Sequence, residues 1–181
     1  MLRRNLYFAP KSVKSKAYQA CVLPIIEYAS TCWSPTSKKL ENSLEMIHHS
    51  AAKFVTNTYP KKGDYNNFSI TKLLNDLDWT SIEKRREQAK LIMAYKIIKG
   101  LVILDPNILP KTQQQYPRQC NGVKVGFENQ IEEPQARLDV NRSNFFYSTP
   151  KLWNNTLSPT QANAPSIDAF KSSLKKKLVS T

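Results

Sequence analysis

The side chains that most often carry catalysis are sparse in this sequence. The only two histidines, His48 and His49, are neighbours. Adjacent residues on a helix point about 100° apart, so the pair cannot hold one metal ion as histidines at i and i+4 can. We expect both at the surface or at the core edge. Asp76 and Asp78 flank Leu77, which is expected to face the core and leave both carboxylates in solvent. The sequence therefore predicts no catalytic residue and no metal site.

Basic residues are more informative because they cluster near the two ends of the sequence. The 181 residues include 27 Lys and Arg against 14 Asp and Glu, for a formal net charge of +13. Such a surplus favours a polyanionic partner, most simply nucleic acid. Among the cations, Tyr7 and Phe8 either stack on bases or face the core. The cations in the two clusters that we expect to contact phosphate are Arg3, Arg4, Lys11, Lys14, Lys16, Lys175, Lys176 and Lys177.

A third basic group lies in the middle of the chain. Lys84, Arg85, Arg86 and Lys90 alternate with acidic residues at 83 and 87. Opposite charges at helical spacing pair with each other, so this group is predicted to form a solvated, locally neutralised face.

The cysteines and the apolar runs indicate where the chain resides. Cys21, Cys32 and Cys120 cannot all pair, and none lies in a C-x-x-C spacing, which argues against a disulfide scaffold or a zinc knuckle. Reduced, mostly buried thiols are expected. The longest apolar run, residues 20–26, is far shorter than the roughly 20 residues that cross a bilayer. We expect an intracellular, soluble chain with no membrane partner.

Apolar periodicity in the first hundred residues predicts a helical bundle. Residues 11–33 form a helix that Pro24 either kinks or divides in two. A second helix covers about 38–56 and ends at Asn57, and a short third one follows Ser69 as its cap. Thr80 and Glu83 have capping-box spacing, so a fourth helix is expected from about 81 to a stop at Gly100.

Composition changes after this bundle. Residues 105–137 are rich in proline and glutamine and predict an irregular segment, with a weak hairpin near 123–127. A short strand is expected within 138–147, then a helix starting at Thr149-Pro150 and a last helix capped by Ser166. The predicted fold is mainly α, with a bundle over 1–104, a linker over 105–137 and a small C-terminal α/β segment over 138–181.

Several blocks resemble one family of polymerases. They are L-R-R-N-L (2–6), S-K-A-Y-Q-A-C-V-L-P-I-I-E-Y-A-S-T-C-W (15–33), L-E-M-I-H-H-S-A-A-K-F-V (44–55), L-N-D-L-D-W-T-S-I-E-K-R-R (74–86), Y-K-I-I-K-G-L (95–101), F-F-Y-S-T-P-K-L-W-N-N-T-L (145–157) and A-P-S-I-D-A-F-K (164–171). In this order they are similar to the region after the palm in jockey-like non-LTR retrotransposon reverse transcriptases, which are RNA-directed DNA polymerases.

The resemblance implies a helical thumb and a C-terminal segment that grip a template–primer of RNA or RNA–DNA hybrid. It also implies partners in the palm and fingers of the intact parent, where magnesium would act, and a nuclear or cytoplasmic location. The palm's metal-binding aspartates have no counterpart here, so this chain is expected to need no cofactor and to be inactive alone, as a fragment or a decayed copy.

Single positions add to the resemblance and depart from it. Lys53 stands where relatives have an arginine and joins the expected phosphate contacts. His48-His49-Ser50 stands where relatives usually have Gln-Arg-Arg, and Ser148 stands where relatives often have an arginine, which weakens the implied phosphate contact at both places. The alternative is a stand-alone basic helical module that binds another protein, with its charge serving solubility.

Overall fold

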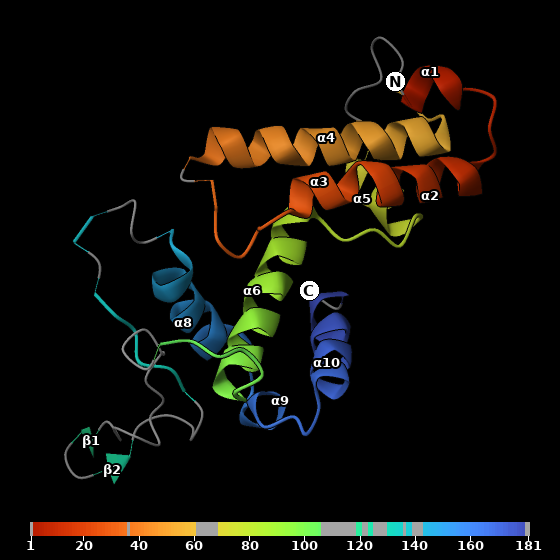
Figure 1. Cartoon of the computed structure of the whole chain (residues 1–181). Coiled ribbons are helices and arrows are strands. Elements are labelled where there is room, and N and C mark those ends of the chain that lie inside the picture. The colour runs from red at the N-terminus through yellow and green to blue at the C-terminus, as the bar shows by residue number, and fades with distance from the viewer. Residues whose placement is uncertain are drawn as a thin grey trace. The chain divides into compact units, whose positions relative to one another are not determined.

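The fold is mainly α, as the sequence predicts. The computed structural model describes residues 2–35, 37–60, 69–105, 119–120, 123–124, 130–135, 137–138 and 143–179. Figure 1 shows the elements in chain order: α1 (Leu2–Asn5), α2 (Lys11–Cys21), α3 (Leu23–Glu27), α4 (Lys38–Thr56), α5 (Ile70–Asn75), α6 (Ile82–Ile98), β1 (Gln119–Cys120), β2 (Val123–Lys124), α8 (Phe145–Thr156), α9 (Pro159–Ala162) and α10 (Ile167–Val179).

Contacts divide the chain into two compact units. Unit 1 comprises residues 1–30 and 35–85, and unit 2 comprises residues 31–34 and 86–181. The sequence suggested a boundary at 104, whereas the observed one falls inside α6. The reason is the core of unit 2: Leu91, Ala94 and Tyr95 of α6 pack with residues of the C-terminal helices. Most of α6 therefore belongs with the second half of the chain.

Unit 1 is built on the long helix α4. Helices α2 and α3 lie along it in Figure 1, and α5 also packs against it. One part of the core joins Tyr18, Leu23 and Ile26 to Ile82, and a second part joins Ala52 to α5. Trp79 packs against both parts, so a single ring links the two.

Pro24 divides the first predicted helix in two. Helix α2 ends at Cys21, and α3 starts at Leu23 with the proline in its first turn. At that position a missing backbone N–H removes no helical hydrogen bond. The break between the two helices changes the direction of the chain, and Tyr18 of α2 and Ile26 of α3 are both buried in the same core.

The predicted stop and start signals of unit 1 are mostly confirmed. Asn57 ends α4 in the left-handed conformation with φ of 54°, and the Ser69 hydroxyl accepts a hydrogen bond from the Lys72 backbone at 3.3 Å. The capping box at Thr80 is wrong by one residue. The Ser81 hydroxyl instead accepts from the Lys84 backbone at 3.4 Å, and the carboxylate of Glu45 accepts from the first backbone N–H of α6.

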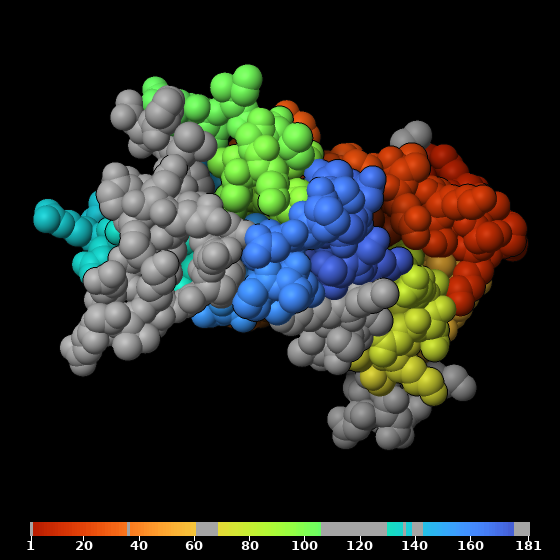
Figure 2. All heavy atoms as spheres, turned by 90° about the horizontal axis from the view of Figure 1, so that it is seen from below, coloured from red at the N-terminus to blue at the C-terminus, as the bar shows by residue number. Residues whose placement is uncertain are grey.

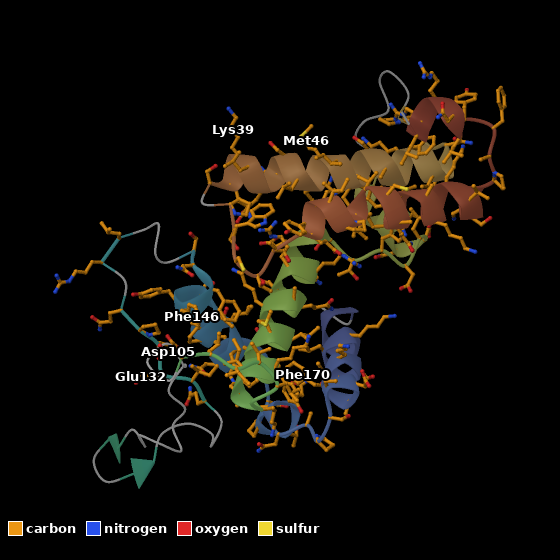
Figure 3. All side chains as sticks on the ribbon, viewed as in Figure 1. Lys39, Met46, Asp105, Glu132, Phe146 and Phe170 are labelled. Carbon is orange, nitrogen blue, oxygen red and sulfur yellow. The ribbon has the colours of Figure 1, made fainter. Side chains whose placement is uncertain are left out.

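Unit 2 packs α8, α9 and α10 against α6. Figure 2 shows the green atoms of α6 adjoining the blue atoms of the C-terminal helices. In Figure 3, Phe170 projects from α10 toward α6. Its ring stacks on Tyr95 at 4.4 Å and on Trp153 at 5.9 Å between centroids. The buried residues of this core are Leu91, Ala94, Tyr95, Ile97, Ile131, Phe145, Trp153, Leu157, Ala162, Ala164, Phe170 and Leu174.

The helix boundaries of unit 2 follow the sequence in two places and differ in one. Gly100 has φ of 69° just past the end of α6, and the Ser166 hydroxyl accepts from the Ala169 backbone at the start of α10, as predicted. The helix expected to begin at Thr149 already begins at Phe145, with Pro150 inside it. Phe145, Pro150 and Trp153 are all buried, and that packing offsets the backbone hydrogen bond that proline cannot make.

The short strand expected within 138–147 is not found among the described residues there, because 145–147 are helical. Residues 139–142 lie outside the described part, as does most of 105–137. Two described residue pairs form the antiparallel β1–β2 ladder, with Gln119 opposite Lys124 and Cys120 opposite Val123. From Ser143 to Val179 every described element is a helix, so the expected α/β segment is α in that stretch.

Candidate nucleic-acid interface

Four of the predicted N-terminal cations are exposed on unit 1. Arg3 and Arg4 lie on α1, and Lys11 and Lys16 lie on α2. The first acidic residue of the sequence is Glu27. Within the described part of the chain, none of the four cations forms an ion pair. Their charge is therefore available to an external anion.

Arg3 is positioned by Tyr59, which follows α4. The Arg3 guanidinium donates a hydrogen bond to the Tyr59 hydroxyl at 3.0 Å and lies 5.4 Å from the centre of the ring. The hydroxyl and the ring of Tyr59 are both uncharged, so these contacts orient the guanidinium without cancelling its charge. Stacking on an aromatic face suits arginine, whose planar guanidinium is less strongly hydrated than an ammonium group.

Lys14 is a correction to the predicted site. Its side chain is only 1% exposed, its amine donates to the Asn57 side-chain oxygen at 2.9 Å, and the amine lies 5.0 Å from the centre of the Phe54 ring. A phosphate cannot reach this amine without opening the unit. Lys14 therefore joins α2 to the C-terminal end of α4 and does not contribute to the exposed basic surface.

This assignment gives a prediction about two lysines on one helix. We expect Lys14→Ala to lower the free energy of unfolding of unit 1 by about 2 kcal/mol, because the substitution removes a buried stem and leaves Asn57 without its donor. Duplex affinity should change less than about twofold, since losing phosphate contacts is what weakens such binding. Hydrogen exchange measures the first quantity and fluorescence anisotropy the second.

Lys16→Ala is the matched control, because Lys16 is exposed on the same helix. We expect the opposite pattern, unchanged stability and weaker duplex binding. If Lys14→Ala weakened duplex binding as much as Lys16→Ala while the protein stayed folded, the structural role of Lys14 would be wrong.

The remaining predicted cations lie in different surroundings. Lys53 of α4 is half-buried, and its charge contributes to lowering the pKa of His49. Lys175 is exposed on α10 in unit 2, while the side chains of Lys176 and Lys177 lie outside the described residues. Nearby, Lys171 pairs with Asp168 at 3.7 Å. The exposed N-terminal cations and Lys175 thus belong to different units.

Three cations of the basic group at 84–90 make contacts within the fold and do not form the predicted solvated face. The guanidinium of Arg85 donates to both carboxylate oxygens of Glu27, a residue far away in sequence. Arg86 is buried, with its guanidinium 3.9 Å from the centre of the Trp33 ring. Sequence alone predicted local pairs and missed these long-range partners.

Lys90 is the other buried cation of this group. Its amine donates to the Ser148 hydroxyl at 3.1 Å, which joins α6 to α8. Burial lowers the pKa of Lys90, the neighbouring Arg86 lowers it further, and Glu87 opposes the shift. Lys90 is therefore part of the interior of unit 2, and its position signals packing rather than phosphate contact.

His48 lies in the core of unit 1 rather than at its edge. It is 1% exposed, its Nδ1 is 2.8 Å from the Tyr18 hydroxyl, and its ring stacks on Trp79 with centroids 5.2 Å apart. Burial is the main cause that lowers the pKa of His48 to about 4, so the ring is neutral at pH 7. A neutral imidazole accepts the tyrosine hydrogen bond, and Nδ1 is then the acceptor.

Other reactive groups support no catalytic assignment in the described ranges. No three His, Cys, Asp or Glu side chains there lie close enough to hold a metal ion. Asp76 and Asp78 are exposed, as expected. Cys21 and Cys32 are also exposed, which corrects the expectation of buried thiols, and the Cys120 side chain lies outside the described residues. None of the described helices is both long and apolar enough to cross a membrane.

Comparison with known proteins adds no identification. No protein-family model matches the chain, and the searches of curated proteins and of solved structures found no match to it.

Proposed function

We propose that this chain is the thumb and post-palm region of a jockey-like non-LTR retrotransposon reverse transcriptase, and that it grips an RNA or RNA–DNA hybrid template–primer. The observation that carries the proposal is the exposed basic surface of Arg3, Arg4, Lys11 and Lys16, which has no acidic partner among the described residues. The ordered series of sequence blocks that resembles this family supports it.

The chemistry of the surface suits positioning. Exposed cations neutralise backbone phosphates and release condensed counterions, which gives affinity that does not depend on base sequence. A thumb holds a duplex in place while another part of the polymerase forms the bond. In this proposal the palm and fingers of the parent carry out synthesis and hold the magnesium that it needs, and this chain contributes the grip on the template–primer.

Salt dependence tests the proposal. We expect the chain to bind an RNA–DNA hybrid with an affinity that falls steeply with salt. The Arg3→Gln/Arg4→Gln double variant should reduce the magnitude of the slope of log K against log salt by roughly 1.4–1.8, since each of the two lost phosphate contacts removes roughly 0.7–0.9. Fluorescence anisotropy across a salt series measures this slope.

The matched control is Lys38→Gln/Lys39→Gln, which removes the same charge from the start of α4. That site lies about 28 Å along the helix from Asn57, where α2 is joined to α4. We expect the control to keep the wild-type slope. Equal losses in both double variants would mean that net charge, and not this surface, drives binding.

A protein-binding module is the second candidate, and exposed apolar side chains favour it. Leu40, Met46 and Ile47 of α4 are exposed, and Figure 3 shows Met46 pointing away from α2 and α3. Such a face suits contact with another protein, including the parent's palm and fingers. If the chain bound a protein partner with an affinity insensitive to salt and had no affinity for a hybrid duplex, the protein-binding module would replace the first proposal.

A further inference from the structure

Tyr7 and Phe8 lie between the N-terminal cations in the sequence, and Tyr59 contacts Arg3; all three rings belong to unit 1 and are exposed. Tyr7 is 62% exposed, Phe8 is 96% exposed and Tyr59 is 48% exposed. Burial of an aromatic ring is among the larger single contributions to a fold, and Phe8 receives almost none of it. The stability of unit 1 therefore does not explain a phenylalanine at this position.

Local geometry holds these rings in place. The Leu6 backbone N–H donates to the Leu2 carbonyl at 2.9 Å, and the Ala9 N–H donates to the Leu6 carbonyl at 3.1 Å, so a hydrogen-bonded turn presents residues 7 and 8. The Tyr7 and Phe8 rings meet edge to face at 5.0 Å. Although such a contact uses the edge of one ring and a face of the other, Phe8 is 96% exposed and so keeps nearly all of its ring surface in solvent.

Cations flank Tyr7 and Phe8 in the sequence. Arg3 and Arg4 come shortly before them, Lys11 comes shortly after, and Arg3 is fixed against Tyr59 by its hydrogen bond. A protein partner that covered the rings with apolar side chains would also need carboxylates to pair with these cations. A nucleic-acid strand has phosphates for the cations and base faces for the rings in one molecule.

We infer that the N-terminal aromatic–basic surface, defined by Arg3, Tyr7, Phe8 and Tyr59, binds the unpaired bases of a strand that continues beyond the duplex. The inference rests on the proposed grip on nucleic acid and specifies which part of the template–primer reaches this surface. Bases inside a duplex stack on each other and present only their edges. Apart from the last base pair at a duplex end, only an unpaired base offers a face on which Phe8 can stack.

The test compares three probes with the full chain at one salt concentration: a blunt RNA–DNA hybrid, the same hybrid with an unpaired template extension, and the single strand alone. For the Tyr7→Ala/Phe8→Ala double variant we expect affinity for the two probes with unpaired bases to fall roughly tenfold or more. Affinity for the blunt hybrid should stay within about twofold. Because Phe8 is almost fully exposed, the variant should keep the wild-type melting temperature.

Two further variants separate stacking from general effects. Met46→Ala, which removes a different exposed apolar side chain of unit 1, should leave all three affinities unchanged. Phe8→Trp should keep the wild-type affinity for the extended hybrid, because an indole can also stack on a base. The fluorescence of the added indole should be quenched when unpaired bases stack on it.

Equal losses on all three probes, no loss on any, or an unquenched indole at position 8 would overturn the inference while leaving the phosphate grip in place. So would loss of binding to the palm and fingers with unchanged nucleic-acid affinity, which would assign the rings to a protein interface. If the wild-type chain binds none of the probes, the proposed function itself fails.

Discussion

Replacing Trp153 with alanine is expected to lower the free energy of unfolding of unit 2 by about 3–5 kcal/mol, the usual range for removing a large buried aromatic side chain. Trp153 is fully buried, and its ring stacks on Phe170 with centroids 5.9 Å apart. Phe170 stacks in turn on Tyr95, whose hydroxyl donates to the Ala164 carbonyl at 2.7 Å. The loss of one ring therefore opens a cavity where α6, α8 and α10 meet.

Hydrogen exchange of amides in α8 and α10 measures this effect within unit 2. Trp153→Phe should cost clearly less, because it keeps a ring against Phe170. Ile103→Ala is the matched control, since Ile103 belongs to unit 2 and is 97% exposed, and it should change stability by less than about 0.5 kcal/mol. Protection that survives Trp153→Ala would mean that the aromatic stack does not hold the unit together.

The fold was most predictable where one residue decides the backbone locally. Asn57 and Gly100 end their helices in the left-handed conformation, and Ser69 accepts the hydrogen bond expected of a cap. Each effect acts within one turn of helix, so the sequence contains the whole cause. Pro150 was misread for the opposite reason. Burial of its neighbours outweighs the local preference for proline in a first turn, and burial depends on the rest of unit 2.

For the candidate site, the sequence predicts which residues carry positive charge but not which of them are buried. Sequence identifies the N-terminal cations but treats Lys14 like Lys16, although only Lys14 is buried. A signal was present: Lys14 precedes the buried Tyr18 by one helical turn and so shares its face of α2. The depth of His48 could not be seen in the same way, because Trp79, which stacks on it, is far away in sequence.

Unit 1 is expected to lose about 3 kcal/mol of stability between pH 7 and pH 4 because of His48. Burial is the largest cause that lowers the pKa of this imidazole, from 6.5 to about 4, and the neighbouring charges of His49 and Arg85 act in the same direction. Below pH 6.5 the unfolded chain binds a proton that the folded chain does not. The contribution of the neutral His48 to the stability of unit 1 is therefore fully present above pH 6.5 and is lost as the pH falls toward 4. Each pKa unit corresponds to about 1.4 kcal/mol.

Other groups next to His48 modify the size of the effect but not its sign. Burial also lowers the pKa of His49, which adds to the loss in acid. Burial raises the pKa of Glu45, whose folded form binds a proton more readily, so this carboxyl opposes the loss at low pH. His48 dominates because it is the most deeply buried of these groups, with its ring stacked on Trp79 and its Nδ1 hydrogen-bonded to the Tyr18 hydroxyl.

Hydrogen exchange of amides in α2 and α4, measured from pH 7 to pH 4 and corrected for intrinsic rates, follows the stability of unit 1. His48→Gln should flatten the dependence on pH, because an amide can accept the Tyr18 hydrogen bond but does not titrate. His49→Gln is the matched control, since the neighbouring imidazole is less buried, and it should keep most of the acid sensitivity. If acid sensitivity persisted in His48→Gln and disappeared in His49→Gln, the group that takes up the proton would be His49 and not His48. The stacked core around Trp79 would then not cause the loss of stability in acid.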